Sequence, residues 1–264
     1  MFSSQRLQNA GRDERAAEPK RHPDSKLVVP ARNLLIASLP HPDCSELIQA
    51  ARPVHFSVGD VIYEDGSEID YAYFPIDAVI SSLALLEDGS SVEVSMTGRE
   101  SFVGLPALIG GGRALHWTRI SVAGVTLRIP TTDLRRLFNS NQSLHSAILR
   151  AYRGLFTQIC QRSVCNSRHT LLQRLCVYLL MMNDRLDSDE IPMTQDEIAC
   201  RISVRRAGVS TAGSMLHAMH AIDSRRGKIV IVDRAVLENT ACECYRVLRQ
   251  EFETREDPRS QSKA

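Results

Sequence analysis

The fold is decided by residues 194–211, which read TQDEIACRISVRRAGVST. Thr194 is followed three residues later by Glu197, and this capping box predicts the start of a helix. Ser203 falls where a tight turn is expected, and Val209 begins the apolar stripe of a second helix. The spacing predicts a helix-turn-helix, whose second helix enters the major groove of DNA. The alternative is a generic helical hairpin with a solvated arginine pair.

The expected DNA contacts lie at the start of this second helix and on the segment that follows it. Arginine at that position can bind guanine O6 and N7 or clamp a phosphate. Residues 224–228 are a basic turn before the apolar stretch 229–233, which predicts a β-hairpin wing whose tip meets the DNA backbone. The predicted DNA-binding residues are Thr194, Gln195, Arg205, Arg206, Ser210, Thr211, Arg225, Arg226 and Lys228.

A long helix is predicted upstream, over about residues 143–164. Its apolar residues recur at coiled-coil-like spacing. This stripe consists of Leu144, Ile148, Ala151, Leu155 and Ile159. The stripe either packs on the chain's own β-domain or forms a dimer, and we favour the dimer because a helix-turn-helix binds paired half-sites in two copies. Further helices are predicted over 169–183 and from about 235 into 245.

Residues 54–130 have the pattern of short strands separated by turns at roughly ten-residue spacing. Asp88-Gly89, between the apolar stretch 79–86 and the alternating stretch 91–94, is a strong hairpin signal. Recurring turns of this kind predict an all-β barrel or sandwich. The N-terminal half is therefore expected to be β-rich and the C-terminal half helical.

The formal net charge of +1 conceals a split along the chain. Residues 31–130 contain six Lys and Arg against twelve Asp and Glu, a net charge of −6. Residues 131–264 contain twenty against fifteen, a net charge of +5, and residues 1–30 contain six against four. This contrast predicts two domains with different partners, the basic one containing the predicted helix-turn-helix.

Several protein classes are not expected from the sequence. Residues 1–26 are polar and lack the apolar core of a secretory signal. The sequence contains no apolar run of 18 residues, the length that a membrane-spanning helix needs. P-loop, G-x-S-x-G and H-E-x-x-H motifs are absent, so we do not expect an enzyme. The odd count of seven cysteines fits reduced thiols, and a cytoplasmic protein is expected.

The cysteines form two close pairs in the sequence. Cys160 and Cys165 are five apart, and Cys242 and Cys244 are two apart. Neither pair has the two-residue gap of common zinc knuckles, and no His-x3-5-His follows. We therefore expect plain packing rather than a metal or redox role, with no metal and no cofactor.

The combined order of these segments resembles the Crp/Fnr family of bacterial transcription regulators over roughly residues 32–250. The resemblance rests on three stretches, which are GDVIY to LEDG at 59–89, GRESFVG at 98–104, and the recognition helix with its wing. It implies an α+β fold with an N-terminal β-roll or jelly-roll sensor domain, a long dimerisation helix and a C-terminal winged helix-turn-helix. The implied segments are a disordered arm 1–30, a β-roll 31–141, a dimerisation helix 142–166, a DNA-binding domain 167–250 and a flexible tail 251–264.

The phosphate cassette of nucleotide-binding family members is altered in this chain. Those members have a Gly-Glu pair and later an Arg-Ser or Arg-Thr pair, whereas here Trp117 stands where the phosphate arginine is expected. Without a matched arginine a cyclic phosphate loses its strongest contact, so cyclic AMP or cyclic GMP binding is not expected. The alternative is a regulator gated by a cyclic nucleotide or another small molecule. Its candidate effector pocket comprises Glu100, Ser101, Trp117, Thr118 and Arg119.

The resemblance also implies the partners. They are double-stranded DNA, a second copy of the chain, RNA polymerase and, for a gated regulator, an unknown small-molecule effector. Oxygen sensors of the family hold an iron–sulfur cluster on an N-terminal cysteine group, which residues 1–30 lack. Ala207 and Thr211 replace a glutamate and an arginine that read bases in a cyclic-AMP-binding member, so a different operator is expected.

Overall fold

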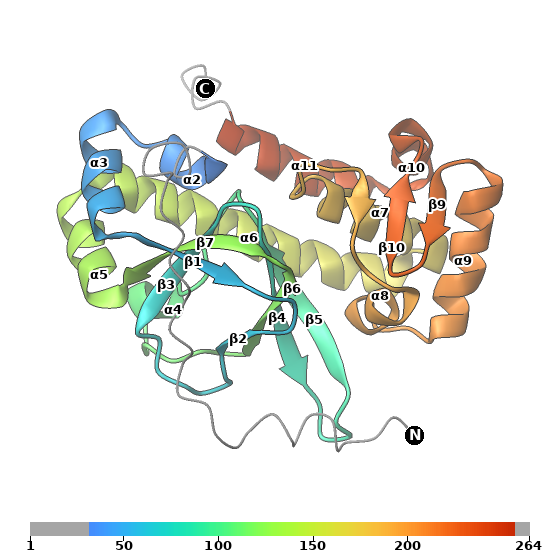
Figure 1. Ribbon diagram of the computed structural model, residues 1–264, viewed down its shortest axis with the longest axis horizontal. Helices are drawn as coiled ribbons and strands as arrows, with labels where there is room; N and C mark the ends of the chain where they lie inside the picture. Colours follow the sequence, from blue (N-terminus) through green and yellow to red (C-terminus); the bar gives the residue numbers. More distant parts are fainter. Residues whose placement is uncertain (1–31, 257–264) are drawn as a thin grey trace.

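The computed structural model describes residues 32–256, and the arm predicted over 1–30 lies outside them. A β-roll and a winged helix-turn-helix lie at opposite ends of the long helix α6 (Gln142–Arg168), as Figure 1 shows. This is the predicted α+β architecture. The long helix ends at Arg168, two residues after the end of the implied dimerisation helix 142–166. None of the helices within the described range is long and apolar enough to cross a membrane.

The β-roll consists of two antiparallel sheets with strand orders β1-β7-β3 and β2-β6-β4-β5. The strands are β1 (Arg52–Phe56), β2 (Val61–Tyr63), β3 (Tyr71–Pro75), β4 (Val79–Leu85), β5 (Ser91–Thr97), β6 (Trp117–Val122) and β7 (Gly124–Pro130). The predicted Asp88-Gly89 hairpin joins β4 to β5, and Gly89 adopts a φ of 80° that a glycine accommodates without strain.

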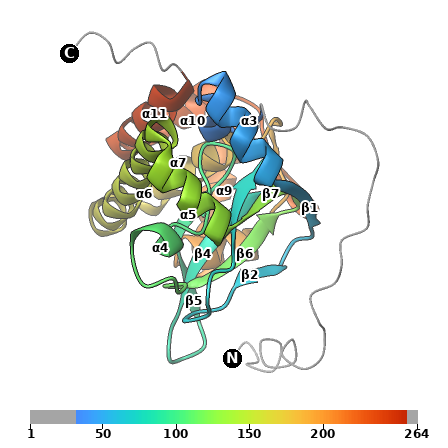
Figure 2. The same cartoon turned by 90° about the vertical axis from the view of Figure 1, so that its left-hand side faces the viewer.

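Helices cover one side of the β-roll, as Figure 2 shows. They are α2 (Leu34–Ala37), α3 (His41–Ala50), α4 (Pro106–Ile109) and α5 (Thr131–Ser140), together with the first half of α6. Phe74 of β3 and Phe102 stack with their ring centroids 5.0 Å apart in this core. Burial of such aromatic and aliphatic side chains stabilises the joint between the β-roll and α6.

The prediction that the stripe on α6 forms a dimer interface is wrong for most of its residues. Leu144, Ile148 and Ala151 are buried in the core of the chain's own β-roll, and Leu155 packs partly against it. The alternative of packing on the β-domain is therefore correct for these four residues. Only Ile159 of the predicted stripe is exposed.

A second apolar stripe on α6 faces solvent instead. It consists of Leu149, Tyr152, Phe156 and Ile159, with Val164 further along the helix. The first four recur at intervals of three, four and three residues, which is the spacing of a helix–helix seam. The Tyr152 and Phe156 rings lie 6.3 Å apart. We call these four residues the exposed α6 stripe.

The winged helix-turn-helix follows α6. Its elements are α7 (Leu171–Asn183), β8 (Glu190–Ile191), α8 (Gln195–Arg201), α9 (Arg206–Ala218), β9 (Ile222–Arg225), β10 (Lys228–Ile231), α10 (Arg234–Thr240) and α11 (Glu243–Glu256). The predicted closing helix from 235 into 245 is wrong, because the chain breaks at Ala241 and Cys242 into α10 and α11. The tail predicted from residue 251 is also wrong as far as Glu256, because these residues continue α11.

The two domains share buried contacts. Val79, Met96 and Val122 of the β-roll belong to the same core cluster as the buried side chains of α7 and α9. Gln158 of α6 accepts a hydrogen bond from the Met96 amide at 2.8 Å and donates one to its carbonyl at 3.1 Å. Because β5 is an edge strand, this side chain satisfies backbone groups that would otherwise be unpaired in a buried place.

Candidate nucleic-acid interface

The helix-turn-helix is formed by α8 and α9, as predicted. Thr194 accepts a hydrogen bond from the Glu197 amide at 3.2 Å, and the Glu197 carboxylate accepts one from the Thr194 amide at 2.7 Å. The predicted capping box is therefore present. Ser203 lies in the turn with a φ of 56°, a left-handed conformation that lets the chain reverse within a few residues.

Helix α9 is anchored by one face and exposed on the other. Val209, Ala212 and Leu216 are buried in the domain core, while Met219 is exposed. A Cβ atom added to Gly208 would lie 2.7 Å from Leu171 Cδ2, so the absence of a side chain there lets α9 approach α7 closely. The first turns of α9 are thereby held in a fixed orientation with their outer face in solvent.

The outer face of α9 contains the predicted recognition residues. Arg205 is the N-cap, and Arg206, Ser210 and Thr211 are all exposed. The Thr211 hydroxyl donates to the Ala207 carbonyl at 3.0 Å, within the helix. The structure therefore places two guanidinium groups and two hydroxyls on one accessible helix surface, which is the chemistry that reads base edges and phosphates.

Sequence reasoning missed one polar residue of this face. Ser214 is exposed one turn beyond Ser210 and donates to its carbonyl at 3.0 Å. Its position four residues after Ser210 in a predicted helix was enough to find it.

The wing is the hairpin of β9 and β10, in a small sheet ordered β8-β10-β9. Arg225 pairs with Lys228 across it, and Gly227 turns with a φ of 78°. Arg226 is exposed at the tip. The predicted basic turn is therefore a projecting hairpin on the same domain as α9 (Figure 1).

Acidic neighbours neutralise some of these cations. Arg206 lies 3.3 Å from Asp196, Arg225 lies 3.1 Å from Asp223, and Lys228 lies 2.6 Å from Glu190. All three pairs are exposed, so each contributes little stability and opens readily for a phosphate. Within the described part of the chain, Arg205 and Arg226 have no ion-pair partner.

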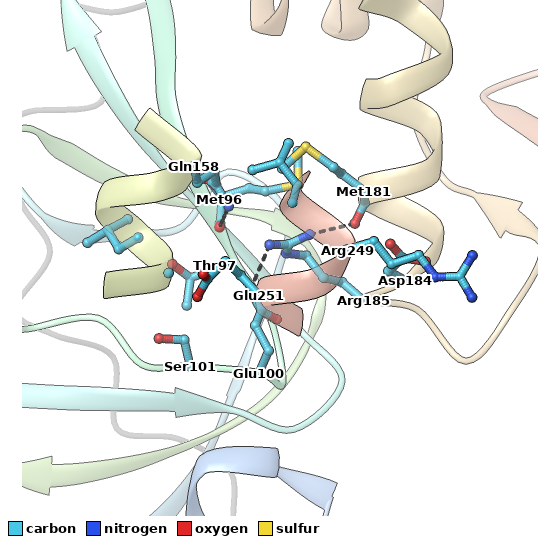
Figure 3. A pocket seen from close by; sticks show the side chains of 13 residues that line it. Met96, Thr97, Glu100, Ser101, Gln158, Met181, Asp184, Arg185, Arg249 and Glu251 are labelled. Carbon is cyan, nitrogen blue, oxygen red and sulfur yellow. Dashed lines mark hydrogen bonds and ion pairs between the residues drawn. The ribbon is translucent and has the colours of Figure 1, made fainter. Parts of the chain in front are cut away.

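One pocket contains two of the five candidate effector residues. Glu100 and Ser101 line a pocket at the junction of the β-roll with α6, α7 and α11 (Figure 3), which Trp117, Thr118 and Arg119 do not line. Thr118 is buried and points to the opposite face of β6 from its two neighbours. That the five residues together form one effector site stays a prediction.

Glu100 has a structural partner in this junction pocket. The Arg185 guanidinium lies 2.8 Å from its carboxylate and donates to the Met181 carbonyl at 2.7 Å. Both side chains are buried, and Figure 3 shows the Arg185 guanidinium reaching toward both partners. Glu100 of the candidate effector pocket thus joins the β-roll to the segment after α7.

The arginines between residues 98 and 119 all have partners. Arg99 lies 2.8 Å from Asp187, and Arg113 lies 3.2 Å from Glu68. Arg119 lies over the Trp117 ring, 5.2 Å from its centroid, in a cation–π contact between residues two apart on β6. A cyclic phosphate bound in this segment would have to displace one of these contacts.

Comparison with known protein families matches both domains. The cyclic nucleotide-binding domain family matches residues 53–141, and the Crp-like helix-turn-helix domain family matches residues 173–240. No curated protein matches the chain by sequence.

Solved structures have a similar fold over nearly three quarters of the chain. FixK2 from Bradyrhizobium japonicum is 19% identical with a TM-score of 0.64, over 73% of this chain and 98% of its own. A CRP-family transcriptional regulator from Thermus thermophilus is 20% identical with a TM-score of 0.59, over 71% and 95%. The c-di-GMP responsive global regulator CLP from Xanthomonas campestris is 13% identical with a TM-score of 0.58, over 74% and 100%.

Proposed function

We propose that this chain, which belongs to the Crp/Fnr family of transcription regulators, binds a specific double-stranded DNA operator as a homodimer. The family consists of transcription regulators rather than enzymes. Each copy inserts the outer face of α9 into the major groove and lays its wing along the backbone. RNA polymerase is the protein that such a regulator would contact at a promoter.

The proposal rests above all on the outer face of α9. Arg206, Ser210 and Thr211 are exposed on this helix and Arg205 is exposed at its N-cap, while Leu216 on its inner side is buried. The alternative is a generic pair of helices with a solvated arginine pair. It requires neither the burial of the inner side of α9 nor the basic β-hairpin of the wing. The combination matches a helix that is held rigidly while its polar face contacts bases.

The second copy is proposed to pack on the exposed α6 stripe. Tyr152 and Phe156 are 42% and 56% exposed, and they would be unusual on a surface with no partner. Two such helices side by side would bury both stripes and set two recognition helices at a fixed separation. A two-fold symmetric pair of half-sites follows from this geometry.

DNA selection with the purified full-length chain tests the proposal. We expect an enriched sequence with two-fold symmetry, and we expect Arg206→Ala to weaken binding to it by about 1–3 kcal/mol while relaxing preference at one base pair of each half-site. Arg136→Ala is the matched control, because Arg136 is also exposed and paired to a carboxylate, but on α5 of the β-roll. If no sequence is enriched and Arg206→Ala binds DNA like the parent, the proposed function is wrong.

The β-roll is proposed not to bind cyclic AMP or cyclic GMP. Trp117 supports this, because it stands where the family's phosphate arginine is expected and the guanidinium of Arg119 lies over its ring, 5.2 Å from the centroid. In calorimetry with either nucleotide we expect no heat beyond dilution. Micromolar binding would favour the effector-gated alternative instead.

A further inference from the structure

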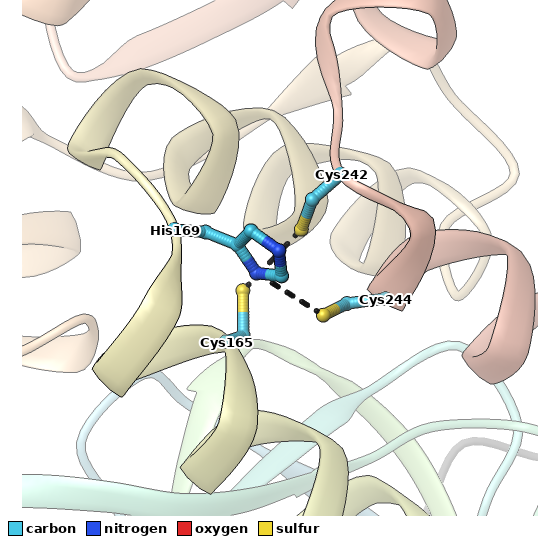
Figure 4. Close-up of side chains that lie close together, drawn as sticks. All are labelled: Cys165, His169, Cys242 and Cys244. Carbon is cyan, nitrogen blue, oxygen red and sulfur yellow. Dashed lines mark hydrogen bonds between the residues drawn. The ribbon is translucent and has the colours of Figure 1, made fainter.

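Three cysteines and one histidine meet where α6 ends and α11 begins. Cys165 lies near the end of α6, His169 is its C-cap residue, Cys242 precedes α11, and Cys244 lies in its first turn. Their sulfur and nitrogen ligand atoms all lie within 4.8 Å of one another. Figure 4 shows the four side chains, from two separate helices, directed toward a common centre. We call these four residues the Cys3His cluster.

Two of the distances between ligand atoms in this cluster are close to those around a single four-coordinate ion. The Cys165 and Cys242 sulfurs are 3.5 Å apart, and the Cys244 sulfur is 3.4 Å from His169 Nδ1. A tetrahedral zinc ion, about 2.3 Å from sulfur and about 2.0 Å from nitrogen, sets its ligand atoms roughly 3.5–3.8 Å apart. A multi-iron cluster divides its four protein ligands among two or four irons and so needs a wider arrangement.

The surroundings of the cluster also suit a metal. His169 Nε2, the nitrogen turned away from Cys244, lies 3.4 Å from the Glu243 carboxylate. A carboxylate on the far nitrogen of a ligating histidine fixes the ring's tautomer and orientation. Gln161 Nε2 donates a hydrogen bond to the Cys244 sulfur at 3.1 Å, a contact that stabilises a thiolate. Packing alone requires neither of these polar partners.

An oxidant-sensing role fits these cysteines less well. Cys165, Cys242 and Cys244 are buried, each with at most 6% of its surface exposed. Redox-sensing cysteines are accessible to their oxidant, whereas buried structural thiols are inert. We therefore interpret the four side chains as ligands of one cation.

We propose that Cys165, His169, Cys242 and Cys244 bind one structural zinc ion that joins the end of α6 to the start of α11. All four positions are filled by protein ligands, so the site is structural rather than catalytic. The ion would close the loop formed by residues 170–241, which contains the entire helix-turn-helix and wing. It would therefore hold the DNA-binding domain at a fixed position on the helix proposed to form the dimer.

Zinc content of the purified full-length chain tests this directly. We expect about one zinc per chain by elemental analysis, and a lower thermal unfolding midpoint after removal with a strong chelator. Cobalt added to the stripped protein is expected to give the visible bands of a tetrahedral ion together with thiolate charge-transfer absorption. These measurements use the parent chain, so they do not depend on any variant folding.

Variants locate the metal at this cluster. Cys244→Ala and His169→Ala are expected to lose the zinc, whereas His169→Cys retains it because four cysteines also bind zinc. Cys160→Ser is the matched control, since Cys160 is exposed on the same helix and outside the cluster. A parent chain free of zinc that also fails to bind cobalt would overturn the proposal, as would iron with sulfide or a Cys165–Cys242 disulfide found by mass spectrometry. None of these readouts involves DNA, so failure here leaves the proposed function standing.

Discussion

Replacing Phe156 by glutamate is expected to convert the proposed homodimer to a monomer and to weaken operator binding by roughly 10²–10⁴-fold. Phe156 is 56% exposed at the middle of the exposed α6 stripe, with Tyr152 beside it. In a dimer the two symmetric stripes would face each other, so each substitution would place a carboxylate in a buried apolar seam. The operator then loses the advantage of two linked half-sites, although contacts within each half-site are unchanged.

Light scattering and DNA-binding measurements on the same samples check this prediction. Leu115→Glu is the matched control, because Leu115 is 71% exposed on a loop of the β-roll and receives the same change in chemistry. We expect the control to remain dimeric and to bind normally. A dimeric Phe156→Glu protein with parental operator affinity would show that the second copy does not pack on this stripe.

Helix α6 shows which structural features a sequence pattern predicts and which it does not. The helix itself was predictable, because its apolar periodicity is local. It has two apolar stripes, however, and a pattern along one chain does not say which of them faces the β-roll. Ile148 is buried and Phe156 is exposed because α5 and the strands approach one side only, which is a property of the tertiary fold.

The other features that were not predicted from the sequence depend on contacts between residues far apart in the chain. The capping box at Thr194 and the tight turn at Ser203 are short-range features, so the helix-turn-helix was predicted correctly. The ion pair of Glu100 was not predicted because its partner, Arg185, lies in the other domain. The Cys3His cluster was missed because Cys242 and Cys244 stand far along the chain from Cys165 and His169.

A buried glutamate links the β-roll to the helix-turn-helix. The Glu93 side chain of β5 is fully inaccessible to solvent and lies 2.7 Å from the Arg162 guanidinium of α6. Arg162 also donates to the carbonyl of Arg201, the last residue of α8, at 2.9 Å. On its other side Glu93 accepts a hydrogen bond from Ser81, whose hydroxyl meets that of Ser121. Polar groups therefore connect three neighbouring strands to the first helix of the DNA-binding motif.

Removing the charge of Glu93 is therefore expected to be strongly destabilising. Glu93→Gln keeps the volume of the side chain but leaves the largely buried guanidinium of Arg162 without its counter-charge. Loss of one partner of a buried ion pair costs about 3–5 kcal/mol, and we expect the free energy of unfolding to fall by that amount. Hydrogen exchange is also expected to accelerate in α8, because Arg162 no longer holds the Arg201 carbonyl in place.

Glu64→Gln provides the control for this substitution, since Glu64 is exposed after β2 and its side chain has no ion pair within the described residues. We expect its urea midpoint and its exchange in α8 to match the parent, because surface carboxylates contribute little. If Glu93→Gln unfolds at the parental urea concentration, the Glu93–Arg162 contact does not stabilise the joint between the domains. If stability falls while exchange in α8 is unchanged, the network stabilises the β-roll alone, and the helix-turn-helix is positioned by the apolar core that β4, β5 and α7 share.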